Sequence, residues 1–267
     1  MPLDNSRIVS IAQNVPGPLA VAQLHAAGAS VVKIEPTSGD PFLALSPEWH
    51  AEMHEGIAIE RLDLKSAEGR ERIFELTSDA DLFVTSQRPS ALARLGLDDA
   101  SLRPRCSRLR FLHIVGSVRD PEQPGHDLTY QAQAGLVTDE VPRTLLADVM
   151  ASERAFSAAL QLLQRPPGSS TYVGLVESLD PLLAPLRHRL TIRTGLLGGG
   201  AVRYGVYSAR VGRIAVAALE PHFENRLFTE LGLPNGASLA ESFLERTAEE
   251  WEVWARAHDL PIVAVKN

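Results

Sequence analysis

The sequence predicts an α/β protein with an open, mostly parallel Rossmann-like sheet, flanking helices and a second, small α+β domain. Two observations carry this prediction. In the first half, short β-rich runs alternate with helical patterns, which indicates βαβ units and a parallel sheet. In the second half, a hairpin pattern is followed by helices without further alternation. With 267 residues, we expect a large domain over residues 1–180, a linker over 181–195 and a small domain over 196–267.

The elements of the large domain follow from local pattern. The expected strands are residues 7–12, 30–35, 57–64, 81–85, 110–115 and 170–176. The expected helices are residues 19–27, residues 66–80 with Ser66 at their start, and a long helix that begins near Asp148 and ends before Pro166. The first strand is not followed by GxGxxG, so the usual dinucleotide fingerprint is missing.

The small domain has a pattern of its own. Residues 180–193, rich in proline and arginine, are expected to act as a linker. A hairpin is expected over residues 202–208 and 213–219, and helices over 221–231, 239–246 and 248–258.

Composition narrows the class of protein. The chain is 45% hydrophobic and 22% charged, as is usual for a soluble globular protein with a sizeable core. A net charge of −7 argues against general nucleic-acid binding. Residues 8–32 carry no charged side chain, but Asn14 and several prolines and glycines interrupt them, so we expect a buried segment and no membrane span. The single cysteine, Cys106, fits a reducing compartment, and we expect a cytoplasmic protein.

Two polar side chains stand where helices are expected to begin. His126 lies in a Gly-His-Asp triplet before a short apolar run, and Asp148 lies in Leu-Ala-Asp before the long helix. Helix starts favour negative charge, and an imidazole and a carboxylate together can act as an acid–base pair. On residue types alone, Asp148 is more often an N-cap and His126 a turn or capping residue.

The motifs, in order, resemble the family of class III CoA-transferases and α-methylacyl-CoA racemases. They are residues 14–36 (NVPGPLAVAQLHAAGASVVKIEP), 62–71 (LDLKSAEGRE), 81–97 (DLFVTSQRPSALARLGL), 125–127 (GHD), 146–148 (LAD), 196–200 (LLGGG) and 203–223 (RYGVYSARVGRIAVAALEPHF). The Pro-Gly-Pro turn, the His-Asp pair and the Glu-Pro-x-Phe helix start are similar to the racemase branch.

This resemblance implies an acyl-CoA enzyme. Its first expectation is epimerisation at the α-carbon of a 2-methylacyl-CoA by two bases, His126 and Asp148, with Glu220 as partner of the imidazole and Asp127 as a further catalytic candidate. Backbone N–H groups at the helix start would hold the enolate oxygen. The alternatives are CoA transfer between carboxylic acids through a covalent intermediate on Asp148, and a non-catalytic CoA-binding relative.

The resemblance also implies the ligand and the partners. CoA enters as part of the acyl-CoA thioester, so neither a separate cofactor nor a metal is expected. Arg94 and Arg88 match the CoA-binding region, with Lys33 and Val15 as further candidates for contact with CoA. A homodimer is expected; the shorter linker and chain end leave open whether it interlocks as family dimers do. Glu153, one helical turn beyond Asp148, is expected to repel substrate or to raise the pKa of Asp148.

Overall fold

The computed structural model describes residues 2–266 and divides the chain into two compact units. The first unit extends to Pro181 and the second begins at Leu182. The second unit therefore begins inside the segment for which the sequence suggested a linker.

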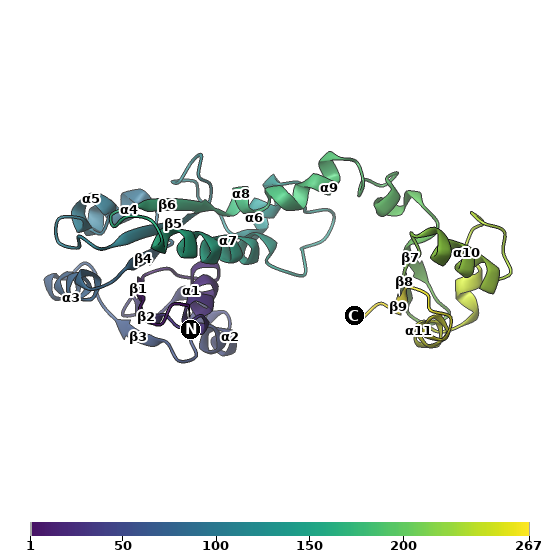
Figure 1. Cartoon of the computed structure of the whole chain (residues 1–267), viewed down its shortest axis with the longest axis horizontal. Coiled ribbons are helices and arrows are strands. Elements are labelled where there is room, and N and C mark those ends of the chain that lie inside the picture. Colours follow the sequence, from purple (N-terminus) through teal and green to yellow (C-terminus); the bar gives the residue numbers. More distant parts are fainter. Residues whose placement is uncertain (1, 267) are drawn as a thin grey trace. The chain divides into compact units, whose positions relative to one another are not determined.

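The first unit contains a six-stranded parallel sheet in the order β3-β2-β1-β4-β5-β6 (Figure 1). The strands are β1 (Arg7–Ser10), β2 (Ser30–Glu35), β3 (Ala58–Arg61), β4 (Leu82–Thr85), β5 (Arg110–Val115) and β6 (Ser170–Gly174). Every neighbouring pair is parallel, which confirms the predicted sheet. β3 is half as long as expected, because the chain turns after it: the Asp63 carboxylate accepts from the Lys65 N–H.

Helices connect and flank these strands. They are α1 (Pro16–Ala26), η1 (Pro41–Ala44), α2 (Pro47–Met53), α3 (Ala67–Ser78), α4 (Pro89–Leu95), α5 (Asp99–Leu102), α6 (Asp127–Gln133), α7 (Leu146–Leu163) and α8 (Leu175–Ser178). The hydroxyl of Ser66 accepts from the Gly69 N–H at the start of α3, as a capping residue should. α1, α2 and α4 begin with proline, whose missing N–H costs nothing in the first turn. Among residues 2–266, no helix is both long and apolar enough to span a membrane.

The core of this unit follows from strand register. Val9, Phe83 and Phe111 lie side by side on β1, β4 and β5, so they face the same way. They pack with side chains of α3, α4 and α5. α1 and α7 pack against each other, and α7 also contacts β5 and β6. Because helices pack against the sheet, the loops at the carboxyl ends of its strands have defined positions.

The second unit has its own small sheet and core. After η2 (Asp180–Leu183), which crosses the boundary between the units, come α9 (Ala184–Arg187), η3 (Leu196–Gly200), β7 (Tyr204–Ser208), β8 (Arg213–Ala217), α10 (Pro221–Glu230), η4 (Ser242–Glu245), α11 (Ala248–Ala257) and β9 (Ile262–Ala264). The strands pair antiparallel in the order β7-β8-β9. The expected hairpin is confirmed, but the helix expected over residues 239–246 is only a 3₁₀ turn, and β9 was not predicted.

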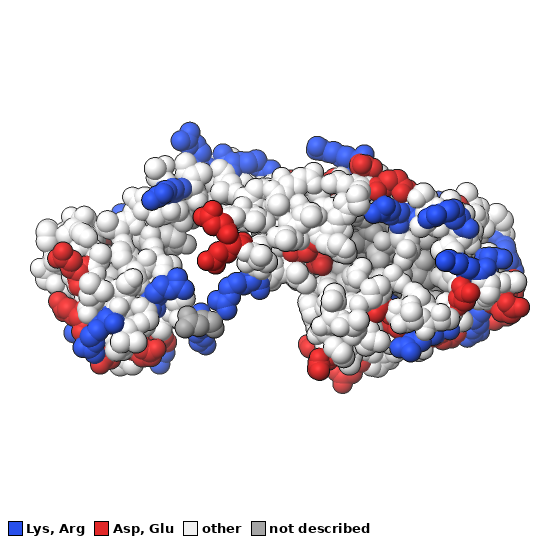
Figure 2. All heavy atoms as spheres, turned by 180° about the vertical axis from the view of Figure 1, so that it is seen from behind, with Lys and Arg blue, Asp and Glu red and all other residues white. Residues whose placement is uncertain are grey.

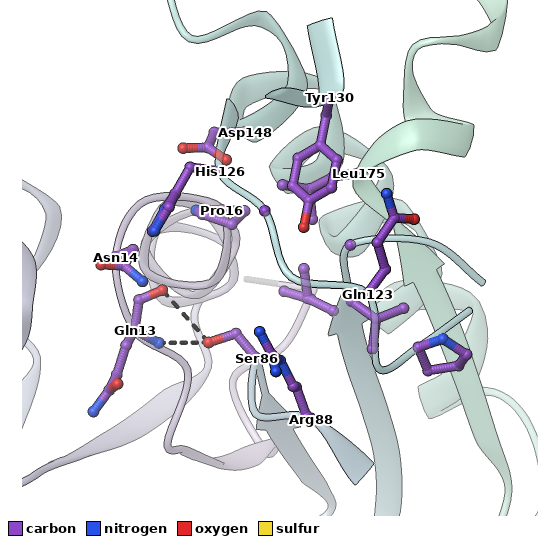
Figure 3. A pocket seen from close by; sticks show the side chains of 15 residues that line it. Gln13, Asn14, Pro16, Ser86, Arg88, Gln123, His126, Tyr130, Asp148 and Leu175 are labelled. Carbon is purple, nitrogen blue, oxygen red and sulfur yellow. Dashed lines mark hydrogen bonds between the residues drawn. The ribbon is translucent and has the colours of Figure 1, made fainter. Parts of the chain in front are cut away.

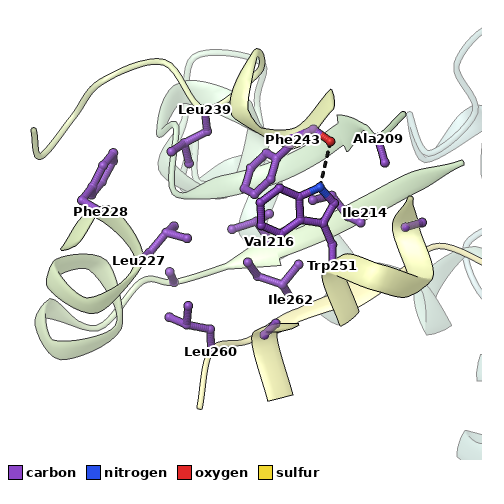
Figure 4. Packing of buried hydrophobic residues seen from close by; sticks show 13 residues of the cluster. Ala209, Ile214, Val216, Leu227, Phe228, Leu239, Phe243, Trp251, Leu260 and Ile262 are labelled. Atoms are coloured by element: carbon purple, nitrogen blue, oxygen red, sulfur yellow. Dashed lines mark hydrogen bonds between the residues drawn. The ribbon is translucent and has the colours of Figure 1, made fainter. Parts of the chain in front are cut away.

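Trp251 stands at the centre of the second core (Figure 4). It is 1% exposed, and its indole N–H donates to the Phe243 carbonyl at 2.8 Å, so its only polar atom is satisfied. On the face seen in Figure 2, charged side chains of both signs are interspersed over each unit.

Candidate active site

A cavity opens at the carboxyl ends of β1, β4 and β5 (Figure 3). The chain leaves β1 toward β2 on one side and β4 toward β5 on the other, so this is the point where the strand order reverses and where open α/β sheets bind ligands. The cavity has a volume of about 130 Å³. Its lining residues are Gln13, Asn14, Pro16, Ser86, Arg88, Ile114, Val115, Gly116, Pro121, Gln123, Gly125, His126, Tyr130, Asp148 and Leu175.

Asp148 lines this cavity from the first turn of α7. It is the third residue of the helix, and Leu145 holds the N-cap position, so Asp148 is not the N-cap that its residue type suggested. Burial, with the negative charge of Asp127 second, raises the pKa of Asp148 from its ordinary value of 3.8 to about 7. Both the carboxylate and the acid are therefore populated near neutral pH.

Asp127 provides the cap that Asp148 does not. Its buried carboxylate accepts through Oδ1 from the Ala147 N–H at 2.8 Å and from the Asp148 N–H at 3.1 Å, and Oδ2 accepts from the Gln131 side chain. A side chain of α6 thus caps the N-terminus of α7. The N–H groups of Ala147 and Asp148 therefore do not fit the expectation that N–H groups at a helix start hold an enolate oxygen, because both already donate to Asp127.

His126 lines the same cavity as Asp148. It precedes α6 and is exposed, and its backbone N–H donates to the Thr129 hydroxyl at 3.1 Å, which fixes the start of the helix. The structure therefore brings together two of the predicted catalytic residues, one from each helix start.

Glu220 belongs to the second unit. It is an exposed residue that precedes α10, where Pro221 opens the helix. Its partnership with His126 stays a prediction.

The two arginines of the predicted CoA-binding region differ in position. Arg88 precedes α4 and lines the cavity. Arg94 lies on the same helix, exposed outside the cavity lining, and its Nε donates to the Ser90 carbonyl at 3.3 Å. Arg88 is therefore the better placed of the two for a ligand that occupies the cavity.

Lys33 and Val15 are corrected by the structure. Val15 is 2% exposed and packs with Phe42 and Met53, so its side chain faces the core. Lys33 is 0% exposed, and its Nζ lies 2.8 Å from Asp40 Oδ2. A buried ammonium ion needs such a partner, so direct contact of Lys33 with CoA does not fit this structure.

Lys33 is instead the centre of a buried ionic cluster. Its Nζ donates to His54 Nε2 at 3.2 Å, while His54 Nδ1–H donates to the His50 carbonyl at 2.7 Å. Burial is the main cause that lowers the pKa of His54, which suits a neutral ring that accepts from Lys33. The Asp40 carboxylate also accepts from the Asn14 N–H at 3.1 Å. The cluster thereby anchors the β1–α1 turn that lines the cavity.

Three members of this neighbourhood have the spacing of metal ligands. Within residues 2–266, single ligand atoms of Glu35, His50 and His54 lie within 4.8 Å of one another. Lys33 Nζ is 4.0 Å from Glu35 Oε1 and already supplies the positive charge there. A metal ion would have to displace that ammonium, so the residues present do not fit one.

The prediction that Glu153 raises the pKa of Asp148 is wrong, whereas repulsion of substrate by Glu153 stays a prediction. The causes that raise the pKa of Asp148 are burial and Asp127. Glu153 is exposed, and its carboxylate accepts from the Gln23 side chain of α1 at 2.7 Å. It therefore joins two helices outside the cavity lining.

Several lining residues escaped the sequence analysis. Gln13 and Ser86 follow β1 and β4, and the Ser86 hydroxyl accepts from the Gln13 N–H at 2.8 Å. The rule that ligands bind at the carboxyl ends of strands could have identified both from the predicted strand ends. Tyr130 gave no such signal, because an aromatic residue in a short apolar helix is usually core.

A second cavity of about 480 Å³ lies along the same edge of the sheet and shares Gln13 with the first. Its walls are mostly apolar, with Lys65 at one side. Its lining residues are Ile11, Gln13, Ile34, Pro36, Thr37, Leu62, Asp63, Leu64, Lys65, Gln87 and Leu95.

The parallel sheet and its switch-point cavity with an aspartate of raised pKa define an α/β protein with a candidate ligand site. The family model of CoA-transferase family III matches residues 3–267, so the chain belongs to that family. This confirms the resemblance to that family read from the motifs.

The similar proteins of known family are named as CoA-transferases or members of a CoA-transferase family. A probable fatty acyl-CoA transferase of Mycobacterium tuberculosis is 28% identical over 149 residues, which are 51% of this chain and 38% of that protein. An (R)-2-hydroxy-4-methylpentanoate CoA-transferase of Clostridioides difficile is 30% identical over 51% of this chain and 38% of its own. A CaiB/baiF CoA-transferase family protein of Caenorhabditis elegans is 24% identical over 93% and 81%. All three names refer to CoA transfer.

Solved structures support the fold. A crystal structure of an M. tuberculosis protein superposes with a TM-score of 0.85 at 22% identity, covering 100% of this chain and 84% of that one. A CAIB/BAIF family protein from Brucella suis gives 0.80 at 20% identity, with the same coverage.

Proposed function

We propose that this chain transfers CoA between carboxylic acids through a covalent intermediate on Asp148. The observation that carries the proposal is the position of Asp148, in a switch-point cavity, with a pKa raised to about 7. A carboxylate that is partly desolvated is a better nucleophile than one in water. The family and the named relatives support the same class of reaction.

The reaction balances without any group beyond the two substrates. The Asp148 carboxylate attacks the thioester carbonyl of the donor, expels CoA thiolate and forms a mixed anhydride. The thiolate attacks the aspartyl carbonyl, which releases the donor acid and leaves an aspartyl–CoA thioester. The acceptor carboxylate then attacks this thioester, expels CoA thiolate and forms a second anhydride. The thiolate attacks the acceptor-derived carbonyl of that anhydride, which yields the new acyl-CoA and releases the Asp148 carboxylate.

The two cavities suggest how an acyl-CoA is divided between them. A volume of about 130 Å³ is below the usual range of about 300–1,000 Å³ for a whole ligand, so the first cavity suits a short acyl group at the reacting carbon. The second cavity, which shares Gln13, suits the nucleotide end, with apolar walls for a flat ring and Lys65 for a phosphate. Arg88 lies where it can attract the carboxylate of an acceptor acid.

Trapping tests the proposal. The protein is incubated with short-chain acyl-CoA thioesters and hydroxylamine, and peptide mass spectrometry locates any hydroxamate. We expect it on Asp148, with label from a ¹⁴C-carboxylic acid entering the acyl-CoA pool when hydroxylamine is left out. Arg88→Ala should weaken substrate use roughly 10- to 100-fold, the loss of one charge-assisted contact. Arg165→Ala is the control, because Arg165 is exposed after the end of α7 and lines neither cavity. Absence of both hydroxamate and label exchange across the thioester panel would remove the proposal.

A second candidate is the epimerisation expected from the resemblance. It is favoured because His126 and Asp148 line the same cavity. The pKa of Asp148, about 7, suits both donation and acceptance of a proton. A 2-methylacyl-CoA in D₂O without acceptor acid would gain deuterium at C2 by this route and not by transfer. If neither reaction appears but calorimetry shows CoA binding, the chain is a binding relative.

The resemblance also carries the expectation of a homodimer, which light scattering of the purified protein tests.

A further inference from the structure

Tyr130 is a buried phenol that faces the cavity and has no partner there. The residue is 4% exposed, and its side chain lines the cavity from α6. Within residues 2–266, no group makes a hydrogen bond with its hydroxyl. In Figure 3 this hydroxyl points down into the cavity, with His126 to its left and Arg88 below it. Buried tyrosine hydroxyls usually have a hydrogen-bond partner, so a free one in a cavity points to a ligand atom.

Two glycines make room for this side chain. A Cβ added at Gly116 would overlap the Tyr130 hydroxyl, and one added at Gly125 would lie 2.5 Å from Cζ of the ring. Neither glycine has a positive φ, so the backbone conformation does not explain them. The close approach of the phenol does, and it holds the hydroxyl in one place with little freedom to turn away.

The two N–H groups beside Asp148 at the start of α7 are not available to a developing negative charge. Tetrahedral intermediates of acyl transfer carry an oxyanion that needs hydrogen-bond donors. The N–H groups of Ala147 and Asp148, at the start of α7, donate to the Asp127 carboxylate. They are therefore committed to holding the helix and are not free for the substrate.

We propose that Tyr130 is a catalytic residue whose hydroxyl donates a hydrogen bond to the carbonyl oxygen of the acyl group under attack by Asp148. The inference rests on the proposed transfer. The phenol keeps its proton throughout, so its role involves a hydrogen bond and no proton transfer. As the carbonyl becomes tetrahedral, the negative charge on its oxygen strengthens the hydrogen bond, and this lowers the barrier to forming and to collapsing each anhydride.

The surroundings keep Tyr130 a donor. Burial raises the pKa of its hydroxyl; Arg88 opposes this and Asp148 adds to it. Because the pKa of this phenol lies above its ordinary value of 10.0 and that of Asp148 is about 7, the pH range between them combines a carboxylate at Asp148 with a neutral, donating hydroxyl at Tyr130.

The test is Tyr130→Phe, which removes one oxygen and keeps the ring between the two glycines. Rapid-quench kinetics with hydroxylamine measures the rate at which Asp148 is acylated, and calorimetry measures the Kd for free CoA. We expect acylation to slow on the order of 100-fold, with Kd and the denaturation midpoint unchanged. Tyr172→Phe is the matched control: that tyrosine lies on β6, stacks on His113 at 4.5 Å between ring centroids and is outside the cavity lining, so its variant should acylate at the wild-type rate.

The outcomes separate the two proposals. Wild-type protein that forms the Asp148 hydroxamate, together with Tyr130→Phe that forms it equally fast, overturns the role of Tyr130 and leaves transfer intact. Loss of acylation with a matching loss of stability or of CoA affinity assigns Tyr130 a structural role and also overturns the inference. Wild-type protein that forms no hydroxamate overturns transfer and this role with it.

Discussion

At the scale of single residues, the chemistry of this site depends on the charge of Asp148. Two features of its surroundings decide that charge: burial of the side chain, and the Asp127 carboxylate on another helix. Both disfavour ionisation. Asp148 is thus held in a state that costs folding free energy and favours reaction.

Replacing this residue should therefore stabilise the protein. The folded-state pKa of about 7 lies above the ordinary 3.8, so the folded state retains a proton that the unfolded state loses. Wild-type stability should fall as the pH rises from about 4 to about 7, and then level off. Asp148→Asn lacks this loss, so its advantage should grow over the same window and reach on the order of 1–3 kcal/mol at pH 8. Urea unfolding from pH 4 to pH 8 measures it. Glu153→Gln, on the exposed side of α7, is the control, and an equal pH dependence in Asp148→Asn and wild type would contradict the assignment.

At the scale of elements, the site is the meeting of two helix starts. α6 contributes His126 to the cavity and Asp127 to the start of α7, while α7 contributes Asp148. Because Asp127 accepts from the two N–H groups that begin α7, the spacing of His126 and Asp148 is fixed by hydrogen bonds and not only by packing. The same carboxylate both positions Asp148 and raises its pKa.

These two roles of Asp127 can be separated by substitution. Asp127→Asn retains an oxygen for the Ala147 and Asp148 N–H groups but removes the charge, so the pKa of Asp148 should fall. The low-pH limb of the transfer rate, where Asp148 becomes protonated, should move to lower pH, with the fold retained. Asp127→Ala also loses the cap and should cost a further 1–2 kcal/mol or so of stability. A rate–pH profile and a denaturation curve for each variant measure both effects. If the low-pH limb of the Asp127→Asn profile lies at the same pH as in the wild type, the charge of Asp127 does not act on Asp148.

At the scale of the whole molecule, each of the two units has a hydrophobic core of its own. One surrounds the parallel sheet, and the other surrounds Trp251 with Phe243 at 5.2 Å between ring centroids. No residue of the second cluster belongs to the first. Each unit is therefore expected to unfold independently, while the other unit keeps its structure.

Trp251→Ala tests this independence. Removing a side chain that is 1% exposed should destabilise the second unit by about 3–5 kcal/mol. Hydrogen exchange followed by mass spectrometry should show faster exchange in β7–β9 and α11, with β1–β6 protected as before. Val253→Ala, on the same helix and 69% exposed, should change neither unit. Faster exchange throughout the parallel sheet in Trp251→Ala would mean that the two units unfold together.

The sequence alone determined what depends on local pattern. Alternating β-rich and helical runs gave the parallel sheet, Ser66 marked the start of α3, and two helix starts marked His126 and Asp148 as residues of one site. These succeed because hydrophobic period and capping act over a few neighbouring residues. The short strand β9 was missed because three residues carry too little period to be recognised.

The tertiary structure alone decided what depends on contacts between distant parts of the chain. Lys33 has the sequence context of a surface cation, yet Asp40 and His54 surround it, and it supports the site from within. Asp127 caps a helix that starts 19 residues later, and the free hydroxyl of Tyr130 depends on Gly116 and Gly125. Burial, the pKa of a carboxyl group and the absence of a hydrogen-bond partner are properties of the space around a side chain. They exist only once the sheet and its helices bring these segments together.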